Sequence, residues 1–181
     1  TPNTSSAASD VYKRQTAFAL WIIYICLTVV EMILLHLIGE MSIFDAVNHG
    51  FTTMATGGFS TRDASIGYYD SLTVEIIIIA FMFIGGINFT LIWFLIGREF
   101  VKAYADEEFK TYLVYIFTAV SFMMVALIST NVSLGDSFRQ SVFQAISIGT
   151  STGYTTQDYM TWPVLTPVSY THLRAHETDT D

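Results

Sequence analysis

Three apolar stretches of the chain are each long enough to cross a lipid bilayer. They are residues 16–38, 73–97 and 111–130, and a membrane-spanning helix needs about 20 apolar residues at about 1.5 Å each. Only 13% of the 181 residues are charged, whereas ordinary soluble domains have about 25%. The stretches therefore predict a multi-pass, all-α integral membrane protein. Buried helices of a large soluble protein are the alternative, but so short a chain has too few polar faces to cover three of them.

The two ends of the chain differ from its middle. Residues 1–15 and 168–181 are polar, lack periodicity and resemble translated sequencing-adapter read-through. We expect both to be non-native and exclude them from the fold. The formal net charge of −8 argues against nucleic acid as a partner. The single cysteine, Cys26, lies inside an apolar stretch and has no second cysteine with which to form a disulfide.

The segments between the apolar stretches differ in their basic residues. Segment 98–110 contains three basic side chains, whereas segments 39–72 and 131–160 contain one each. Cytoplasmic loops of membrane proteins are enriched in Lys and Arg, while acidic residues count little in that rule. The pattern therefore predicts a cytoplasmic position for 98–110 and an outward position for the other two segments.

A polar, glycine-containing phrase occurs twice. It reads TTMATGGFSTRD at 52–63 and IGTSTGYTTQD at 148–158, with Gly58 and Gly153 at equivalent places 95 residues apart. A short semi-apolar helix of about three turns is expected before each phrase. The predicted helix starts are Ser42–Asp45 and Ser137–Gln140, because each has a hydroxyl followed three residues later by a side chain that can reach back. A repeat at this period indicates a repeated structural unit of span, half-helix, polar loop and span.

These polar loops have the chemistry of a cation path. Irregular backbone at membrane depth is tolerated only where it is buried in protein or lines a watery cavity. A half-helix that enters from outside points its negative C-terminal end toward the membrane centre. Glycine allows backbone angles that turn successive carbonyls toward one axis, where they replace the hydration shell of an ion. The repeat therefore predicts a potassium-channel-like filter of backbone carbonyls.

The order of these motifs resembles the Trk/Ktr/HKT superfamily of potassium transporters. The resemblance covers residues 16–167 and is closest to the bacterial Trk and Ktr membrane subunits. It rests on a helix, a pore helix, TTMATGGFSTRDASIGYYDS, a helix with FMFIGGINF, and then REFVKAYADEEFKTY. Members of that superfamily have four such units around one pore, and the units here resemble the second and third, in a truncated fragment. The implied segments are a pore unit at 16–97 (span 16–38, pore helix and filter 42–61, span 73–97), the loop 98–110, and an incomplete unit at 111–167 (span 111–130, pore helix and filter 137–156).

The resemblance also implies site residues and partners. The selectivity glycines fall on Gly58 and Gly153, and the coordinating carbonyls on 55–57 and 150–152. The full implied filter consists of Ala55, Thr56, Gly57, Gly58, Phe59, Thr150, Ser151, Thr152, Gly153 and Tyr154. It would bind potassium through the backbone, without a side-chain metal site or a covalent cofactor. Implied partners are membrane lipid, a second copy of the complete subunit, and a cytosolic regulatory subunit that binds NAD or ATP, at the bacterial plasma (inner) membrane.

Other functions fit the sequence less well. An intramembrane hydrolase needs a nucleophile and a base at one depth, and no histidine or carboxylate matches between the two repeats, so we do not expect an enzyme. A sodium or mixed-cation transporter of the same fold would be favoured by serine in place of a filter glycine, but Gly58 and Gly153 favour potassium. A non-transporting membrane scaffold is a further alternative.

Several polar residues have two open interpretations. Glu31 and Glu75 lie in apolar stretches, where ionisable side chains are often functional, but both are near enough to the outward ends to snorkel to the interface. Asp63 and Asp158, with the other outward acidic residues Asp45, Asp70 and Asp136, form either a solvated face or an acidic vestibule that concentrates cations.

Two further features have a favoured structural interpretation. Gly85 and Gly86 favour close helix packing over a gating hinge. His36 and His49 lack a second ligand at metal-binding spacing, which argues against a metal site.

Overall fold

The computed structural model describes residues 4–87, 91, 92 and 106–157 of the chain. Every regular element within these residues is helical. In chain order they are α1 (Thr4–Leu37), α2 (Ile43–Met54), the short 3₁₀ helix η1 (Ser65–Tyr69), α3 (Leu72–Gly85), α6 (Glu107–Ile128) and α7 (Leu134–Gly149). The predicted loop 98–110 is described only from residue 106 onward, and the predicted tail 168–181 lies outside the described residues.

Within the described residues, two helices are long and apolar enough to cross a membrane. They are Ala17–Leu37 within α1 and Glu107–Ile128, which is α6. The third predicted span, 73–97, begins as the apolar helix α3, which is described as far as Gly85. The backbone of residues 4–15 continues α1 toward the N-terminus, although these residues were excluded from the fold on composition.

The short helices α2 and α7 begin at serine caps. The Ser42 hydroxyl accepts a hydrogen bond from the Asp45 amide at 3.1 Å, as predicted for the first helix. The prediction for the second helix was wrong by one turn, because α7 begins at Leu134 and is capped by Ser133. The side chain of Ser137 is instead buried. Consequently α7 has 16 residues and α2 has 12, although both end at equivalent positions of the repeat.

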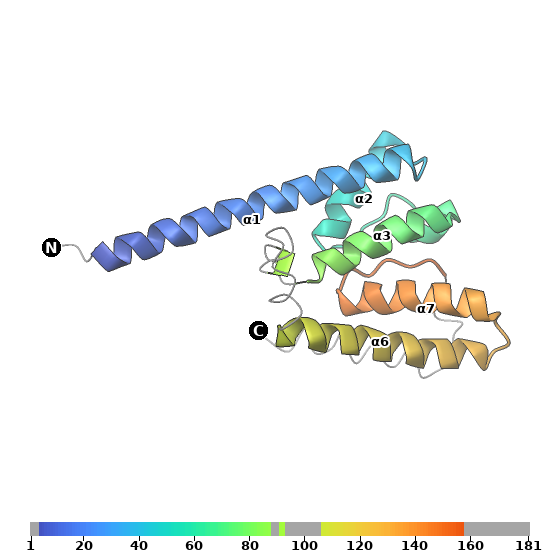
Figure 1. Cartoon of the computed structure of the whole chain (residues 1–181). Coiled ribbons are helices and arrows are strands. Elements are labelled where there is room, and N and C mark those ends of the chain that lie inside the picture. The colour runs from blue at the N-terminus through green and yellow to red at the C-terminus, as the bar shows by residue number, and fades with distance from the viewer. Residues whose placement is uncertain (1–3, 88–90, 93–105, 158–181) are drawn as a thin grey trace.

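The helices pack as two neighbouring groups joined at α3. Helix α1 packs on α2 and α3, α6 packs on α7, and α3 also contacts α7. Figure 1 shows α3 and α7 side by side in the centre, with α2 above them and α6 below. Both polar loops therefore lie between the two groups, close to the ends of α2 and α7.

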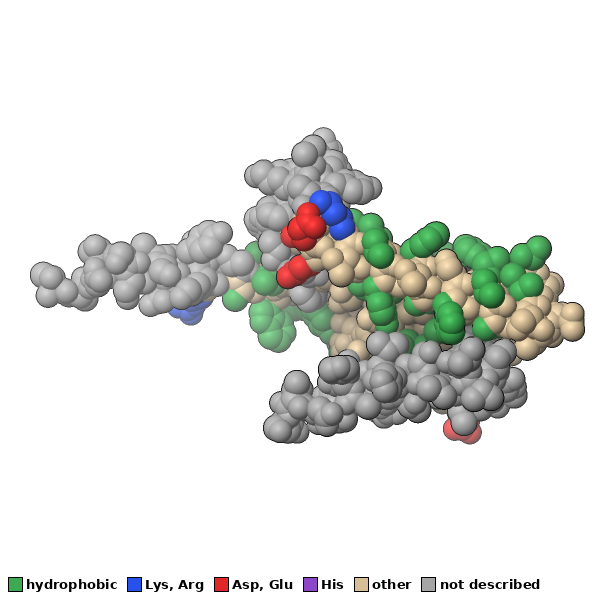
Figure 2. Space-filling model, turned by 90° about the horizontal axis from the view of Figure 1, so that it is seen from below, with side chains coloured by type: hydrophobic (Ala, Val, Ile, Leu, Met, Phe, Trp, Pro, Cys, Tyr) green, Lys and Arg blue, Asp and Glu red, His purple; other side chains and the backbone are tan. Residues whose placement is uncertain are grey.

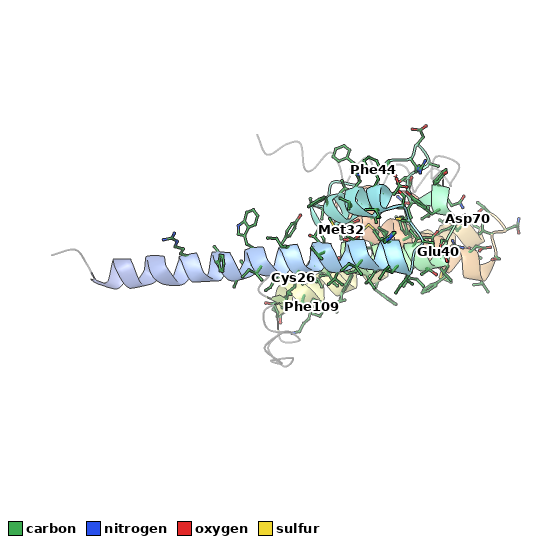
Figure 3. The ribbon with its side chains drawn as sticks, turned by 90° about the horizontal axis from the view of Figure 1, so that it is seen from above. Cys26, Met32, Glu40, Phe44, Asp70 and Phe109 are labelled. Atoms are coloured by element: carbon green, nitrogen blue, oxygen red, sulfur yellow. The ribbon has the colours of Figure 1, made fainter. Side chains whose placement is uncertain are left out.

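The core lies where these helices meet. Leu35, Ile78, Met82, Phe143 and Tyr154 belong to one buried cluster contributed by α1, α3, α7 and the second polar loop. In Figure 3, Met32 of α1 lies beside α2, whereas Phe44 points away from the helices.

The outer surface of the long helices is apolar. Phe117 on α6 is 75% exposed and Trp21 on α1 is 68% exposed. Figure 2 shows apolar side chains spread over the described part of the face in view, with few charged side chains among them. Soluble monomeric proteins rarely expose so large an apolar surface to water. This surface is suited to contact with lipid, as expected for a membrane protein.

Candidate functional site

The first polar loop begins where α2 ends and turns back on itself. Thr56 has φ +50° and Gly58 has φ +61°, both in the left-handed region that favours glycine. The amides of Gly57 and Gly58 donate to the carbonyl oxygen of Thr52 at 2.7 and 3.3 Å. These bonds close the end of α2 and hold the loop directly beyond its last turn.

The second polar loop has the same backbone conformation. Ser151 has φ +57° and Gly153 has φ +84°, at the positions equivalent to Thr56 and Gly58. The Gly153 amide donates to the carbonyl oxygen of Ser147 at 3.2 Å. Ser147 is equivalent to Thr52 in the repeat. The repeat in the sequence is therefore also a repeat in backbone geometry.

A hydroxyl on each short helix forms a hydrogen bond with the backbone of its loop just after the glycine. The Thr52 hydroxyl donates to the Phe59 carbonyl at 2.9 Å. The Ser147 hydroxyl donates to the Tyr154 carbonyl at 2.7 Å. This pair of equivalent bonds was not predicted, although the hydroxyls at equivalent places in the two repeats were visible in the sequence.

The two loops meet at their glycine phrases. A Cβ atom added to Gly58 would collide with the carbonyl oxygen of Thr152, so the two backbones are in contact at this point. Farther along, the Gly67 amide in η1 donates to the Thr155 carbonyl at 3.1 Å. The Thr155 amide in turn donates to the Ser65 hydroxyl at 3.3 Å. Helix η1 thus holds the second loop against the first.

The arrangement places carbonyl groups where a cation would be stabilised. Helices α2 and α7 both direct their C-terminal ends, which carry partial negative charge, into these loops. Within the described residues, no hydrogen bond ends on the carbonyl oxygens of Ala55, Thr56 or Gly57. Carbonyl oxygens without a protein donor are available to replace the hydration shell of a cation.

The aromatic residues of the two loops have different surroundings. Phe59 is 76% exposed, whereas the equivalent Tyr154 is completely buried. The Tyr154 hydroxyl lies 2.5 Å from the Thr52 hydroxyl, and a longer distance of 3.4 Å separates it from the His49 carbonyl oxygen. Tyr154 therefore links the second loop to the helix that supports the first.

Comparison with known proteins places this geometry in a family. The family model of TrkH, described as a cation transport protein, matches residues 12–173. The chain belongs to the TrkH family. The resemblance inferred from the repeated motifs is thus confirmed.

Individual TrkH relatives match over the same region. The Trk system potassium uptake protein TrkH of Escherichia coli (strain K12) is 41% identical over 157 residues, which are 85% of this chain and 32% of that protein. The Trk system potassium uptake protein TrkG of the same strain is 36% identical over 159 residues, which are 84% of this chain and 32% of that protein. The chain therefore spans about a third of the length of the curated relatives that it matches.

A solved TrkH structure has the same fold. The crystal structure of the potassium transporter TrkH from Vibrio parahaemolyticus superposes with a TM-score of 0.81 at 37% sequence identity. The match covers 88% of this chain and 35% of that chain. The all-α membrane-protein fold predicted from the sequence is confirmed, and these relatives are transporters rather than enzymes.

Around the first polar loop, an ion pair between a buried carboxylate and an exposed arginine fixes the segment after the glycines. Asp45 is 3% exposed; it accepts hydrogen bonds from the Thr61 hydroxyl at 2.6 Å and from Arg62 at 3.1 Å. The hydrogen bond from Thr61, with those from Ser42 and Arg62, lowers the pKa of Asp45 to about 2. The Arg62 guanidinium also lies 4.5 Å from the centre of the Tyr68 ring. Asp45 thus serves the loop structure and is not part of an open acidic vestibule.

His49 makes a second buried connection to the loop. Its Nδ1 lies 2.7 Å from the Asp45 carbonyl oxygen, and its Nε2 lies 3.0 Å from the Ser60 hydroxyl. Since a carbonyl can only accept, Nδ1 carries the proton and Nε2 accepts from Ser60. Burial lowers the pKa of His49, so the ring is neutral near pH 7 and has both nitrogens engaged in hydrogen bonds.

Because the pKa of Asp45 is lower in the fold than its ordinary value of 3.8, ionised Asp45 stabilises the fold above about pH 4. This contribution is lost as the pH falls through the folded-state pKa of about 2. We expect the melting temperature of the wild type to drop by several degrees between pH 6 and pH 3, and that of Asp45→Asn to drop less. Thermal unfolding of the purified chain in detergent measures both. An equal drop in melting temperature for the wild type and Asp45→Asn would contradict a stabilising role for ionised Asp45.

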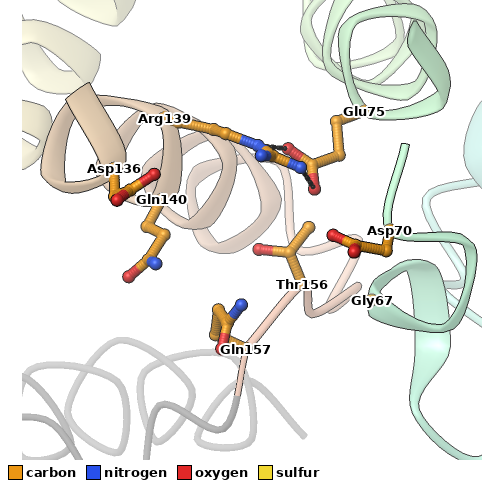
Figure 4. A pocket seen from close by; sticks show the side chains of 8 residues that line it. All are labelled: Gly67, Asp70, Glu75, Asp136, Arg139, Gln140, Thr156 and Gln157. Carbon is orange, nitrogen blue, oxygen red and sulfur yellow. Dashed lines mark hydrogen bonds and ion pairs between the residues drawn. The ribbon is translucent and has the colours of Figure 1, made fainter. Parts of the chain in front are cut away.

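A polar cavity lies beside the second polar loop. It has a volume of about 300 Å³ and is lined by Gly67, Asp70, Glu75, Asp136, Arg139, Gln140, Thr156 and Gln157. Figure 4 shows Arg139 reaching across from α7 to Glu75 on α3. Arg139 Nε and Nη2 donate to the two Glu75 carboxylate oxygens at 2.6 and 2.8 Å. The predicted vestibule residue Asp63 is exposed, and Asp158 lies outside the described residues.

The two glutamates in the apolar stretches do not snorkel to the surface of the described structure. Glu31 is completely buried and Glu75 is 3% exposed. Glu75 is paired with Arg139, a partner 64 residues away that the sequence did not indicate. Near the end of α3, a Cβ on Gly86 would overlap Thr150 and Tyr112 side-chain atoms, which supports the close-packing interpretation for Gly86. A Cβ on Gly85 would meet no atom nearer than 3.8 Å.

Proposed function

We propose that this chain supplies two neighbouring pore units of a potassium uptake subunit. One observation carries the proposal: two loops with the same left-handed turns follow the C-terminal ends of α2 and α7 and touch each other at Gly58 and Thr152. The names of the relatives as potassium uptake proteins support the choice of ion. As the family resemblance implies, glycine at 58 and 153 favours potassium over sodium. Both glycines adopt a positive φ, where a side chain is strained.

In this proposal, potassium binds to backbone carbonyls of 55–57 and 150–152, together with those of the other two units that the resemblance implies. The Thr52 and Ser147 hydroxyls hold the Phe59 and Tyr154 carbonyls, so the far flank of each loop is fixed. Within the described residues, the carbonyls of Ala55, Thr56 and Gly57 accept no hydrogen bond. Because the loop flanks are fixed, the carbonyl oxygens cannot adjust equally well to cations of different size. The free energy of coordination then differs between potassium and sodium.

The proposal extends to placement and partners. The subunit would lie in the bacterial inner membrane with 98–110 on the cytoplasmic side, and would form a homodimer that binds a cytosolic, nucleotide-binding regulatory subunit. The naming of the relatives as parts of a Trk system supports a multi-component assembly. The charged start of α6, with Glu107, Glu108 and Lys110, is the described segment best suited to a soluble partner.

Growth of cells that lack their own potassium importers tests this function. The complete subunit that carries this sequence should restore growth at low external potassium, together with its regulatory partner. Added sodium should not replace potassium. A subunit that reaches the membrane in normal amounts but never restores growth would contradict the proposal.

A further inference from the structure

Glu31 occupies a completely buried place between α1 and α2. It shares one face of α1 with Thr28 and Leu35, which are also buried, and this spacing of three and four residues is that of a helix packing face. Within the described residues, neither carboxylate oxygen of Glu31 has a hydrogen-bond partner. An ionised carboxylate buried alone in an apolar region is costly, and such a group takes up a proton instead.

The Thr53 hydroxyl beside Glu31 can accept a hydrogen bond from it but has no hydrogen left to donate. The Thr53 hydroxyl on α2 faces the carboxyl, although outside hydrogen-bond geometry. Its single hydrogen already donates to the His49 carbonyl at 2.7 Å, so toward Glu31 the Thr53 oxygen can only accept. A carboxylate has no hydrogen to offer it, whereas a carboxylic acid has one.

The Thr53 hydroxyl is also connected to both polar loops through neighbouring hydroxyl groups. Thr53 Oγ1 lies 3.4 Å from the Tyr154 hydroxyl, which lies 2.5 Å from the Thr52 hydroxyl. Thr52 in turn donates to the Phe59 carbonyl. The chain of contacts therefore runs from Thr53 to the aromatic residue of the second loop and to the backbone of the first.

The charged and titratable groups around this place leave the carboxyl without a cation. They are Tyr24 on α1, His49 on α2, Tyr69 on η1 and Tyr154 on the second loop. His49 is neutral near pH 7, and Arg62 is paired with Asp45. Within the described residues, no ion pair involves Glu31.

We infer that Glu31 is a proton-bearing positioning residue: its carboxylic acid donates to Thr53 and so holds the hydroxyl chain that anchors Tyr154 and the filter loops. This inference rests on the proposed function for its effect on ion selectivity. The protonation itself does not depend on that function, and the two parts can be tested separately.

Infrared spectroscopy of the purified chain in detergent at pH 7 tests the protonation. The wild type should show the carbonyl stretching band of a protonated carboxylic acid, and this band should be missing from Glu31→Gln. Glu31→Gln keeps the shape of the side chain and can still donate to Thr53. A difference spectrum without that band would overturn the inference, whatever the protein transports.

Ion selectivity of the complete subunit tests the positioning role. Glu31→Gln should keep the ratio of potassium to sodium uptake within about twofold of the wild type, whereas Glu31→Leu, which lacks a donor, should lower it about tenfold. A loss in Glu31→Gln equal to that in Glu31→Leu would show that a negative charge is needed and overturn the inference. A normal ratio in Glu31→Leu would show a merely space-filling role and overturn it too.

A second variant covers the case in which Glu31→Leu does not fold. Thr53→Val removes the hydroxyl and keeps the side-chain shape, so it should also lower the uptake ratio about tenfold. A normal ratio in a well-expressed Thr53→Val would overturn the inference. Failure of the proposed function is recognised differently, since the wild type itself would then show no preference for potassium.

Discussion

Gly58→Ser should lower the ratio of potassium to sodium uptake by the complete subunit about a hundredfold. A side chain at φ +61° costs on the order of 1–2 kcal/mol. The added Cβ would also collide with the Thr152 carbonyl oxygen, and a backbone atom cannot move aside without shifting the second loop. Because every 1.4 kcal/mol is about tenfold, strain and collision together reach an effect of this size. Uptake of both ions in cells without other potassium importers measures it.

Two matched glycines serve as controls for this result. Gly153 has φ +84° but open space around its Cβ position, so Gly153→Ser carries the strain alone and should cost about tenfold. Gly135, at the exposed start of α7, has neither a positive φ nor a neighbouring atom within 4 Å, and Gly135→Ser should have no effect. Equal effects at Gly58 and Gly135 would contradict the contact between the two loops.

Arg139→Ala should destabilise the chain by about 3 kcal/mol. The change leaves the Glu75 carboxylate, with 4% side-chain exposure, buried and unpaired, and breaking a buried ion pair from one side typically costs about 3–5 kcal/mol. The lower end applies because Arg139 itself is 34% exposed. Denaturant unfolding of the purified chain in detergent measures the loss in free energy of unfolding. The melting temperature provides a second measurement.

The exposed pair Lys110–Glu107 is the control for this second prediction. Its side chains are 51% and 86% exposed, so Lys110→Ala should cost less than about 1 kcal/mol. The double variant Glu75→Gln, Arg139→Gln should recover much of the stability lost in Arg139→Ala, since no buried charge remains. A loss in Arg139→Ala no larger than that in Lys110→Ala would contradict a stabilising role for the buried pair.

The repeat could be predicted from the sequence because it is local. Glycine at 58 and 153 follows a short helix at a fixed distance, and the structure gives both positions a positive φ. The start of α7 could not be fixed in this way. Ser133 and Ser137 each precede a polar side chain by three residues, and local capping chemistry alone does not choose between them. The earlier serine is used, which adds one helical turn and its backbone hydrogen bonds.

Contacts between distant segments could not be predicted. Glu75 and Arg139 are opposite charges in mostly apolar surroundings, but nothing in their spacing identifies them as partners across 64 residues. The difference between Phe59 and Tyr154 is similarly hidden, because equivalent aromatic residues face different neighbours in the two units. Only the packing of α3 on α7 and of the second loop on α2 reveals these roles.

As proposed, the two glycine loops form part of a potassium-selective filter. Uptake of radioactive rubidium into liposomes that contain the complete subunit and its regulatory partner tests it most directly, with potassium or sodium added as competitor. The wild type should lose rubidium uptake when potassium is added and keep it with the same concentration of sodium. Gly58→Ser should become sensitive to sodium. Equal competition by the two ions in the wild type would contradict a potassium-selective filter at these loops.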